Sequence, residues 1–289
     1  MQMDAFYRKK PWYAGQFVRK IIPKITIPGD TNFYFTALLN KLKQRLLSVL
    51  VRDVDKMFLE TIVNLPVLDN GEIDYSLIHM LVSEIKSNYI ITLKTYLTTS
   101  EQNDYNLTTE EKKVLNGIKI LRYENFKITD IFNIKNSGNI LSRDIVENSG
   151  DIPYLCASAE NNSVSSYISY DKNYLDEGNC IFIGGKTFVV TYQENDFYSN
   201  DSHNLILYLK DAKKRNRNIQ LFIATCIIKS LGNKYYWGDS ISHKKIQKDS
   251  VWLPAKNHKP DYATMELIAS AIQKLIIKEV VSYINNFVE

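Results

Sequence analysis

The chain has 289 residues and a mass of 33.5 kDa, which excludes a single small core and is sufficient for two ordinary domains. Hydrophobic residues make up 45% and charged residues 24%, so we expect most of the chain to fold rather than to form a disordered tail. The formal net charge of +4 permits a polyanionic partner without requiring one, because the clustering of Lys and Arg on one face decides that question.

Neither a cleavable signal nor an apolar run near ~18 residues is present, since charged residues interrupt even the segment 272–281. We therefore expect a soluble protein with no membrane partner. The three cysteines, Cys156, Cys180 and Cys226, are far apart and lie among apolar or small neighbours. This spacing favours buried, reduced thiols and a cytoplasmic location.

The two ends of the chain resemble each other. The sequence "NLPVLDNGEIDYSLIHMLVSEI" at 64–85 aligns with "WLPAKNHKPDYATMELIASAI" at 252–272 once one residue is gapped. Further matches pair 56–58 with 244–246, 32–47 with 218–233 and, more loosely, 11–24 with 195–211. A repeat of about ninety residues is too long for a solenoid unit, so duplicated domains explain it better.

Each copy has the pattern of a sheet edge, a helix, a basic connection, an extended segment into Leu-Pro, and a final helix near Asp-Tyr. Asp74 and Asp261 are the expected N-caps of the two final helices. The apolar stripes that we expect to pack against other helices are Leu77, Ile78, Leu81, Val82 and Ile85 in the first copy, and Met265, Ile268, Ala269, Ile272, Ile276 and Val280 in the second.

The region between the copies, 107–191, is rich in short alternating segments typical of strands. The expected strands lie at 126–134, 152–158, 165–170, 180–185 and 187–193. This region has no counterpart before residue 11, so the first copy lacks its front half and the second is complete.

Several ordered blocks of this sequence resemble the DNA specificity (S) subunits of type I and BcgI-like restriction-modification systems, and in particular their target recognition domains. The blocks are "FKITDIFNIKNSGNILSRDIVENSGDIPYLCASAENNSVSSYIS", "GNCIFIGGKTFVVTYQENDFYSND" and "LFIATCIIKSLGNKYYWGDSISHKKIQKDSVWLP". The resemblance covers nearly all of 120–275 and, more thinly, 6–90. It implies two recognition domains joined by antiparallel helices, each reading one half of a bipartite site, with no catalysis in the chain.

The polar segment at the end of the strand expected at 152–158 is the first candidate DNA contact. Asn161, Asn162 and Ser163, with Ser158 before them, offer amide and hydroxyl groups suited to base edges or phosphates. An ordinary Asx turn that closes a hairpin explains the same residues, and only the family resemblance favours function.

Two short motifs resemble nucleotide-linked sites. "IGGKT" at 183–187 lacks the first glycine of a phosphate loop and leads into a strand, so we reject a nucleotide site and keep Lys186 as a candidate phosphate contact beside a Gly-Gly turn. "DIPY" at 151–154 resembles the base-holding loop of adenine methyltransferases, but Ile152 replaces its first proline and no glycine-rich cofactor segment precedes it. A strand start explains it better.

Basic clusters in both copies predict a surface that faces phosphates, with a solvated face as the alternative. The second copy contributes Lys213, Lys214, Arg215, Arg217, Lys244 and Lys245 as candidate DNA contacts. Beside them, "NKYYWGD" at 233–239 carries three aromatic residues. We expect Trp237 in the core and keep Tyr235 and Tyr236 as candidates for packing over sugar or base.

The residues show no enzyme site. The histidines, His79, His203, His243 and His258, have no metal-ligand spacing with each other or with cysteine, and we assign no catalytic residue, cofactor or metal. Acidic pairs such as Asp53 with Asp55 lack the context of a nuclease motif.

The sequence therefore predicts an α+β, non-catalytic recognition protein with strands at 107–260, long helices packed as an antiparallel spacer, and an incomplete first copy. The expected domains are a partial recognition domain with its spacer helix at 1–106, a complete one at 107–260 and a final spacer helix at 261–289. The resemblance implies double-stranded DNA and a methyltransferase, modification or fused restriction-modification subunit as partners, and self-association stays open. The rivals are a helix-mediated assembly protein that does not read DNA and a stand-alone DNA-modifying enzyme.

Overall fold

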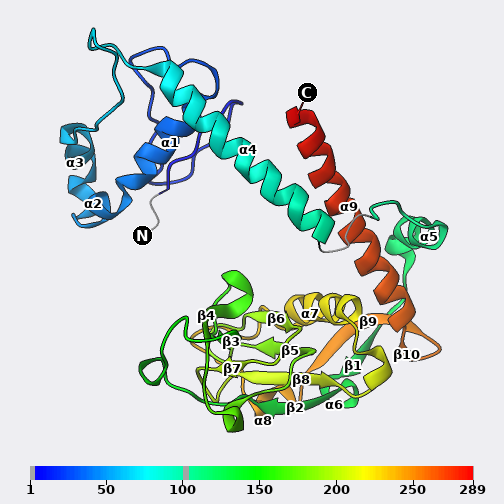
Figure 1. Cartoon of the computed structure of the whole chain (residues 1–289). Coiled ribbons are helices and arrows are strands. Elements are labelled where there is room, and N and C mark those ends of the chain that lie inside the picture. The colour runs from blue at the N-terminus through cyan, green and yellow to red at the C-terminus, as the bar shows by residue number, and fades with distance from the viewer. Residues whose placement is uncertain (1–3, 100–103, 289) are drawn as a thin grey trace. The chain divides into compact units, whose positions relative to one another are not determined.

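The chain forms two compact units, residues 1–103 and 104–289, and the computed structural model describes residues 4–99 and 104–288 (Figure 1). The first unit is helical. Its helices are α1 (Asn32–Lys41), α2 (Lys43–Leu47), α3 (Val54–Glu60) and α4 (Tyr75–Thr99). Residues 4–28, ahead of α1, form neither helix nor strand.

The second unit combines strands with helices. Its strands are β1 (Tyr123–Lys127), β2 (Phe132–Asn136), β3 (Ile152–Leu155), β4 (Val164–Ile168), β5 (Cys180–Ile183), β6 (Val190–Gln193), β7 (Tyr198–Ser199), β8 (Leu205–Leu209), β9 (Ser250–Lys256) and β10 (Lys259–Pro260). Its helices are α5 (Thr109–Gly117), α6 (Ile128–Ile131), α7 (Arg217–Leu231), α8 (His243–Ile246) and α9 (Tyr262–Val288). The sheets have the orders β1-β9-β10, β2-β8-β5-β6 and β4-β3-β7.

The two central strands of the four-stranded sheet, β8 and β5, are buried on both faces. In β5 and β8, successive side chains alternate between two apolar clusters, as strand geometry requires. Leu205, Leu207 and Leu209 enter the larger cluster with α7, whereas Ile206 and Tyr208 enter the smaller one with Leu155 and Phe197. This double burial explains why "CIFI" and "LILYL" are almost continuously apolar rather than alternating.

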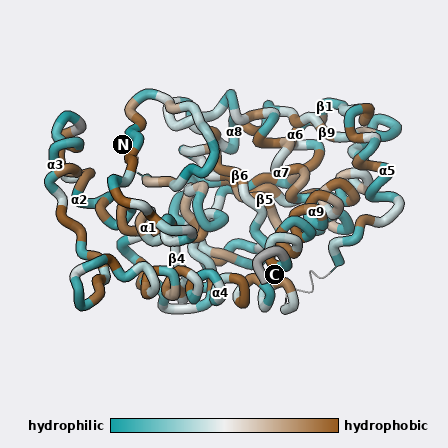
Figure 2. The backbone as a smooth tube through the Cα atoms, turned by 90° about the horizontal axis from the view of Figure 1, so that it is seen from above, coloured by the Kyte–Doolittle hydropathy of each residue, from teal (hydrophilic) through white to brown (hydrophobic). Residues whose placement is uncertain are grey.

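Helix α7 covers one face of this sheet. It packs against β5, β6 and β9, and Figure 1 shows it lying across the strands. Figure 2 shows hydrophobic stretches in α7 and the neighbouring β5. The Asn216 side chain caps α7 by accepting a hydrogen bond from the backbone N–H of Ile219 at 2.9 Å. A capped, amphipathic helix thus closes the larger core.

Helix α5 is joined to α9 by one buried carboxylate. Glu111 Oε1 accepts a hydrogen bond from Ser270 Oγ at 2.6 Å, while Oε2 accepts one from the backbone N–H of Thr108 at 2.8 Å. Lys274 Nζ lies 3.2 Å from the same Oε2. Thr108 in turn caps α5, which completes a capping box. Burial alone would raise the pKa of Glu111, but these bonds and the Lys274 charge together hold the pKa below its ordinary value.

The expected caps of the two long helices are confirmed. Asp74 Oδ1 accepts from the backbone N–H of Leu77 at 2.9 Å, and Asp261 Oδ1 accepts from that of Thr264 at 3.1 Å. The expected stripes are only partly packed within each unit. Ile78, Val82, Met265 and Ile268 are buried, whereas Leu81, Ile85, Ile272 and Ile276 are exposed.

Three predicted elements differ from the structure. The expected strand 126–134 is two strands separated by the helical turn α6, whose first residue donates from its backbone N–H to Asp249 O at 2.9 Å. The segment 195–211, which aligns with 11–24 and was expected to form the sheet edge of the second copy, contains β8, which lies inside its sheet between β2 and β5. No strand occurs at 11–24, because the described residues 4–99 provide no neighbouring strand for it.

The three cysteines form no disulfide. Cys180 is buried as expected, but Cys156 and Cys226 are only half-buried. Burial raises the pKa of the Cys226 thiol to about 11. Within residues 4–99 and 104–288, no helix combines the length and apolar character that crossing a membrane would need.

We expect Glu111→Gln to loosen α5 from α9 at pH 7, because glutamine cannot provide the charge that Lys274 and the capping bonds contact. Loss of charge-assisted hydrogen bonds of this kind costs about 1.5–3 kcal/mol, which corresponds to roughly 10–150-fold faster hydrogen exchange in α5. Hydrogen exchange measured by mass spectrometry on the full chain checks this.

The interaction between Glu111 and Lys274 also makes the attachment of α5 depend on pH. Because the folded-state pKa of Glu111 lies below its unfolded value, its contribution is present above the unfolded pKa and is lost as the pH falls through the folded pKa. The protection of α5 should therefore fall on acidification in the wild type and vary less in Glu111→Gln. Glu110→Gln, one position away and exposed, is the matched control. An equal change in the protection of α5 in both variants would contradict the role assigned to Glu111.

Candidate nucleic-acid interface

The turn between β3 and β4 holds the first candidate residues in an uncommon backbone conformation. Asn161, Asn162 and Ser163 have φ values of 46°, 51° and 69°, in the left-handed region that asparagine tolerates better than most residues. Asn161 Nδ2 donates to Val164 O and Asn162 Nδ2 donates to Tyr192 O, both at 3.0 Å. The amide nitrogens thus hold the turn, and the two exposed side chains retain their oxygens as acceptors.

The two candidate serines, Ser158 before the asparagines and Ser163 after them, are less accessible. Ser163 is buried, and its Oγ donates to Ser158 O at 3.0 Å. Ser158 is half-buried, and its Oγ accepts from the backbone N–H of Glu160 at 3.1 Å. Ser163 therefore shapes the turn and offers no exposed group to a ligand.

Asn161 and Asn162 line a hollow of about 850 Å³. Arg217 lies at the same hollow, and its guanidinium is 3.3 Å from Glu194. The other ionised residues that line it are Asp151 and Asp196. Three carboxylates against one guanidinium disfavour a phosphate, whereas carboxylate and amide oxygens suit the amino groups of adenine and cytosine.

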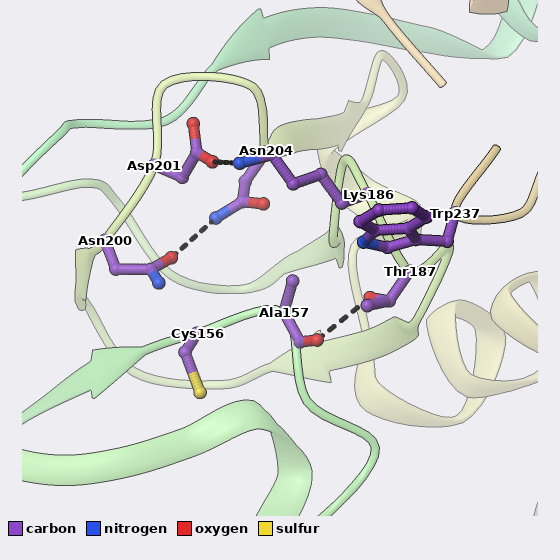
Figure 3. A pocket seen from close by; sticks show the side chains of 8 residues that line it. All are labelled: Cys156, Ala157, Lys186, Thr187, Asn200, Asp201, Asn204 and Trp237. Atoms are coloured by element: carbon purple, nitrogen blue, oxygen red, sulfur yellow. Dashed lines mark hydrogen bonds and ion pairs between the residues drawn. The ribbon is translucent and has the colours of Figure 1, made fainter. Parts of the chain in front are cut away.

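A second hollow, of about 290 Å³, lies at the Gly-Gly turn between β5 and β6 (Figure 3). Lys186 Nζ is 3.3 Å from Asp201 Oδ2, and Asp201 Oδ1 is 2.7 Å from His203 Nδ1. Burial alone would raise the pKa of Asp201, but hydrogen bonds from His203 and Lys186 lower the pKa below its usual value. The Lys186 ammonium is thus exposed at a loop end, beside one carboxylate.

This turn is held closely against its neighbours. The backbone N–H of Gly185 donates to Asn204 Oδ1 at 3.0 Å, and a Cβ on Gly185 would lie 2.4 Å from His203 O. Thr187 Oγ1 donates to Ala157 O at 2.9 Å. Glycine is therefore required at 185 by the close approach of another backbone.

The aromatic residues of "NKYYWGD" have three different surroundings. The prediction of a core position for Trp237 is wrong, because its side chain is 81% exposed and lines the second hollow (Figure 3). Tyr235 is buried, and its hydroxyl donates to Asp249 Oδ2. Tyr236 is exposed. Tyr236 and Trp237 thus present aromatic surface to solvent, whereas Tyr235 belongs to the core.

The basic candidates divide by the contacts they make. Arg215 is engaged internally, with its Nε donating to Leu209 O at 2.7 Å and its guanidinium over the Tyr208 ring. Lys245 contacts Asp239 and donates to Ser240 O at 2.7 Å. Lys213 and Lys244 are exposed, Lys214 is half-buried, and none of these three forms an ion pair with another described residue. Among the basic candidates of the second copy, these three lysines are the ones that no carboxylate of the described residues neutralises.

Several of the candidate residues lie at one end or the other of the four-stranded sheet. At one end, where Cys180 pairs with Gln193, lie the Asn161–Asn162 turn and the basic segment 213–217, which Asn179 Nδ2 contacts at Arg215 O. At the other end, where Ile183 pairs with Val190 and Leu205, lie Lys186 and Trp237. The strands between them span four residues of β5, roughly 13 Å at the usual rise per residue.

One part of the second hollow was missed by the sequence analysis, although its residue spacing carried a signal. Asp201 and His203 were not predicted, although their i, i+2 spacing in "NDSHN" is typical of an Asx turn, which the His203 N–H to Asp201 Oδ1 bond forms at 2.9 Å. No group of His, Cys, Asp and Glu side chains that could hold a metal ion occurs within the parts of the chain that the structure describes.

The sequence model of one protein family, described as the type I restriction modification DNA specificity domain, matches residues 1–95 and 121–285. The chain belongs to this family. The two matched segments agree with the duplication seen in the sequence, and the first of them lies within the unit that lacks strands among its described residues. The family model thus matches one segment that contains the sheets and another whose described residues, 4–95, form no sheet.

Individual relatives are distant. A specificity subunit of a type II restriction enzyme from Heyndrickxia coagulans, S.BcgI, is 26% identical over 155 residues, covering 53% of this chain and 44% of that protein. The chain therefore spans less than half the length of this relative. Solved S subunits from M. genitalium and Thermoanaerobacter tengcongensis are each 11% identical, with TM-scores of 0.44 and 0.40; the matches cover 82% and 77% of this chain and 67% and 59% of theirs.

We expect Gly185→Ala to destabilise the second unit by about 1–3 kcal/mol, because the added methyl group meets the His203 backbone rather than a movable side chain. Chemical unfolding followed by near-UV circular dichroism checks this. Gly15→Ala is the control, since a Cβ there meets nothing within 4 Å. Equal stability of Gly185→Ala and the wild type would show that the turn relaxes, contrary to this account.

Proposed function

We propose that the chain is a DNA sequence-recognition component of a restriction-modification complex, in which residues 107–260 form the complete target recognition domain. The observation that carries this proposal is the family match over both copies, combined with loops at the ends of a rigid sheet that offer acceptors, an exposed indole and exposed lysines. Base edges are read by such hydrogen-bonding side chains, and phosphates by exposed lysines.

The charge surrounding each group of candidates, rather than the end of the sheet at which it lies, suggests a division of labour. Asn161 and Asn162 lie in an acidic hollow, which suits base amino groups better than phosphates. Lys213, Lys214 and Lys244, with Lys186 at the far end, are the proposed phosphate contacts. We propose that one duplex contacts both ends of the sheet, which are separated by the length of β5, roughly 13 Å.

The long helices supply the proposed assembly surface. We propose domain limits of 1–106, 107–260 and 261–289, with α4 and α9 acting as spacer helices. Their apolar stripes leave Leu81, Ile85, Ile272 and Ile276 exposed within their own units, so these residues are available for helix packing. A methyltransferase or fused restriction-modification subunit would bind here and carry out the chemistry on the recognised site.

The two rivals make different predictions. A stand-alone modifying enzyme would bind S-adenosylmethionine as the purified chain. A helix-mediated assembly protein would bind the methyltransferase tightly and DNA only weakly, without sequence preference and with a steep salt dependence.

We expect removal of the Asn161 and Asn162 side chains to reduce discrimination between DNA sequences more than affinity for DNA. The double variant Asn161→Gly/Asn162→Gly removes both amides while keeping a residue that tolerates positive φ. Duplexes enriched from a random pool by the unaltered chain supply the preferred sequence. For each base that is no longer read, the preference for that sequence should fall by about 1–3 kcal/mol.

We expect the matched variant Lys213→Ala/Lys214→Ala to weaken binding similarly for preferred and random duplexes. The slope of log K against log salt should fall by about 1 for each phosphate that the variant no longer neutralises, so by up to about 2. Fluorescence anisotropy between 50 and 200 mM salt, roughly the range over which such interactions are screened, measures both quantities. If the asparagine and lysine variants behave alike, the proposed division of labour fails.

A further inference from the structure

The second hollow has one aromatic wall, which is the Trp237 side chain (Figure 3). Trp237 follows Tyr236 in a tight turn that the backbone N–H of Asp239 closes by donating to Tyr236 O at 2.9 Å. The Lys245 ammonium holds the end of this turn, because it contacts Asp239 and donates to Ser240 O at 2.7 Å. The indole is therefore carried by a fixed turn, although it is 81% exposed.

The indole has no partner of its own. Trp237 forms no hydrogen bond and no ring contact with the other described residues, so its Nε1–H donor and its aromatic surface are available to a ligand. Side chains of this kind usually bury about 150–250 Å². Trp252, the other tryptophan of the second unit, is 54% exposed but lies in β9 and does not line the hollow. Trp237 thus differs from Trp252 in bordering a space that a ligand can enter.

Three loops that are far apart in the sequence form the rest of the hollow and are bonded to one another. Thr187 Oγ1 donates to Ala157 O at 2.9 Å, which joins the β5–β6 turn to the loop after β3. The same turn is joined to the loop after β7, since the backbone N–H of Gly185 donates to Asn204 Oδ1 at 3.0 Å. Asn204 Nδ2 donates in turn to Asn200 Oδ1 at 3.2 Å. The polar floor is therefore formed before any ligand binds, as in most small-molecule sites.

The charged residues of the hollow are one pair of opposite sign. Lys186 and Asp201 line it, and their Nζ and Oδ2 atoms are 3.3 Å apart. Their formal charges cancel, so the hollow favours neither an anion nor a cation. The first hollow differs, since three carboxylates face one guanidinium there. The second hollow therefore suits a neutral ligand.

The size of the hollow and its hydrogen-bonding groups narrow the ligand further. A volume of about 290 Å³ is at the lower limit of pockets that hold small molecules, ~300–1,000 Å³, so it suits one ring system rather than a base pair. The amide of Asn200 is engaged through Oδ1 alone, and its Nδ2 donates to no described residue. A nucleobase is planar and neutral, has hydrogen-bonding edges, and commonly stacks on exposed aromatic side chains.

We propose that the second hollow binds one unstacked nucleobase, which stacks on the Trp237 indole and accepts a hydrogen bond from Asn200 Nδ2. The faces of a base in an intact duplex are covered by its neighbours, so the ligand is a base that has left the stack. The proposal rests on the proposed function for the source of this base, which is the bound DNA. Its chemistry does not, because a free nucleoside presents the same face and edge.

The experiment compares a fully paired duplex of random sequence with the same duplex carrying one extra, unpaired adenosine. Unpaired bases are the least costly to extrude, and stacking on an aromatic side chain favours binding roughly 5–150-fold. We therefore expect the full chain to bind the bulged duplex at least about tenfold more tightly than the paired duplex, as measured by fluorescence anisotropy. With 2-aminopurine as the unpaired base, stacking on the indole should also quench the fluorescence of that base.

Point variants separate stacking from a general effect on the fold. Trp237→Ala should remove the preference for the bulged duplex, and Trp237→Phe should retain most of it, because a phenyl ring still offers a face to the base. Trp252→Ala, which removes an exposed indole elsewhere in the second unit, is the matched control and should leave the preference unchanged. Asn200→Asp keeps the acceptor for Asn204 and removes the donor, so it should lower the preference while the indole is intact.

Equal affinity for the two duplexes, or a preference that Trp237→Ala leaves intact, overturns the proposal without affecting sequence discrimination by Asn161 and Asn162. A chain that binds neither duplex contradicts the proposed function, and a second measurement then decides the proposal. In the variant Trp12→Phe/Trp252→Phe, Trp237 is the remaining tryptophan, and deoxyadenosine should quench its fluorescence to a saturable limit. Quenching that increases linearly with the concentration of deoxyadenosine overturns the proposal.

Discussion

The second unit depends on the burial of both faces of its four-stranded sheet. Strand β8 lies between β2 and β5, and its side chains alternate between two separate apolar clusters. Each fully buried Leu, Ile or Phe contributes about 1.5–3 kcal/mol, and two buried faces allow every residue of the strand to contribute. The loops at both ends of the sheet are therefore attached to a part of the molecule that has little freedom to move.

This constraint also explains the contrast between the two copies. The first copy retains the cap and the long helix, which depend on bonds between residues near in sequence, such as the backbone bond from Asp74 N–H to Pro66 O. It does not form the strands, which depend on neighbours distant in sequence. Local hydrogen bonds thus form in both contexts, whereas strands appear only where their neighbours are present.

The same distinction accounts for what the sequence could predict. Asp74 and Asp261 were recognisable as caps because a capping aspartate and the apolar spacing after it are local signals. The pairing of β1 with β9, more than a hundred residues away, had no such signal. The helical turn α6 interrupted a predicted strand because its first N–H bonds to the distant Asp249 O. Trp237 was expected in the core by residue type, but the loop geometry exposes it.

The placement of the polar loops at strand ends has a consequence for how such a domain changes over time. Substitutions in the loop 156–163 or the turn 184–187 alter the chemistry presented there, while the alternating residues of β5 and β8 keep the layers together. If these loops contact DNA as proposed, preference for DNA sequence and thermodynamic stability are encoded by largely separate residues. Under the proposed function, new preferences then arise by exchanging a few loop side chains, and Gly185, which another backbone approaches closely, is the loop position least free to vary.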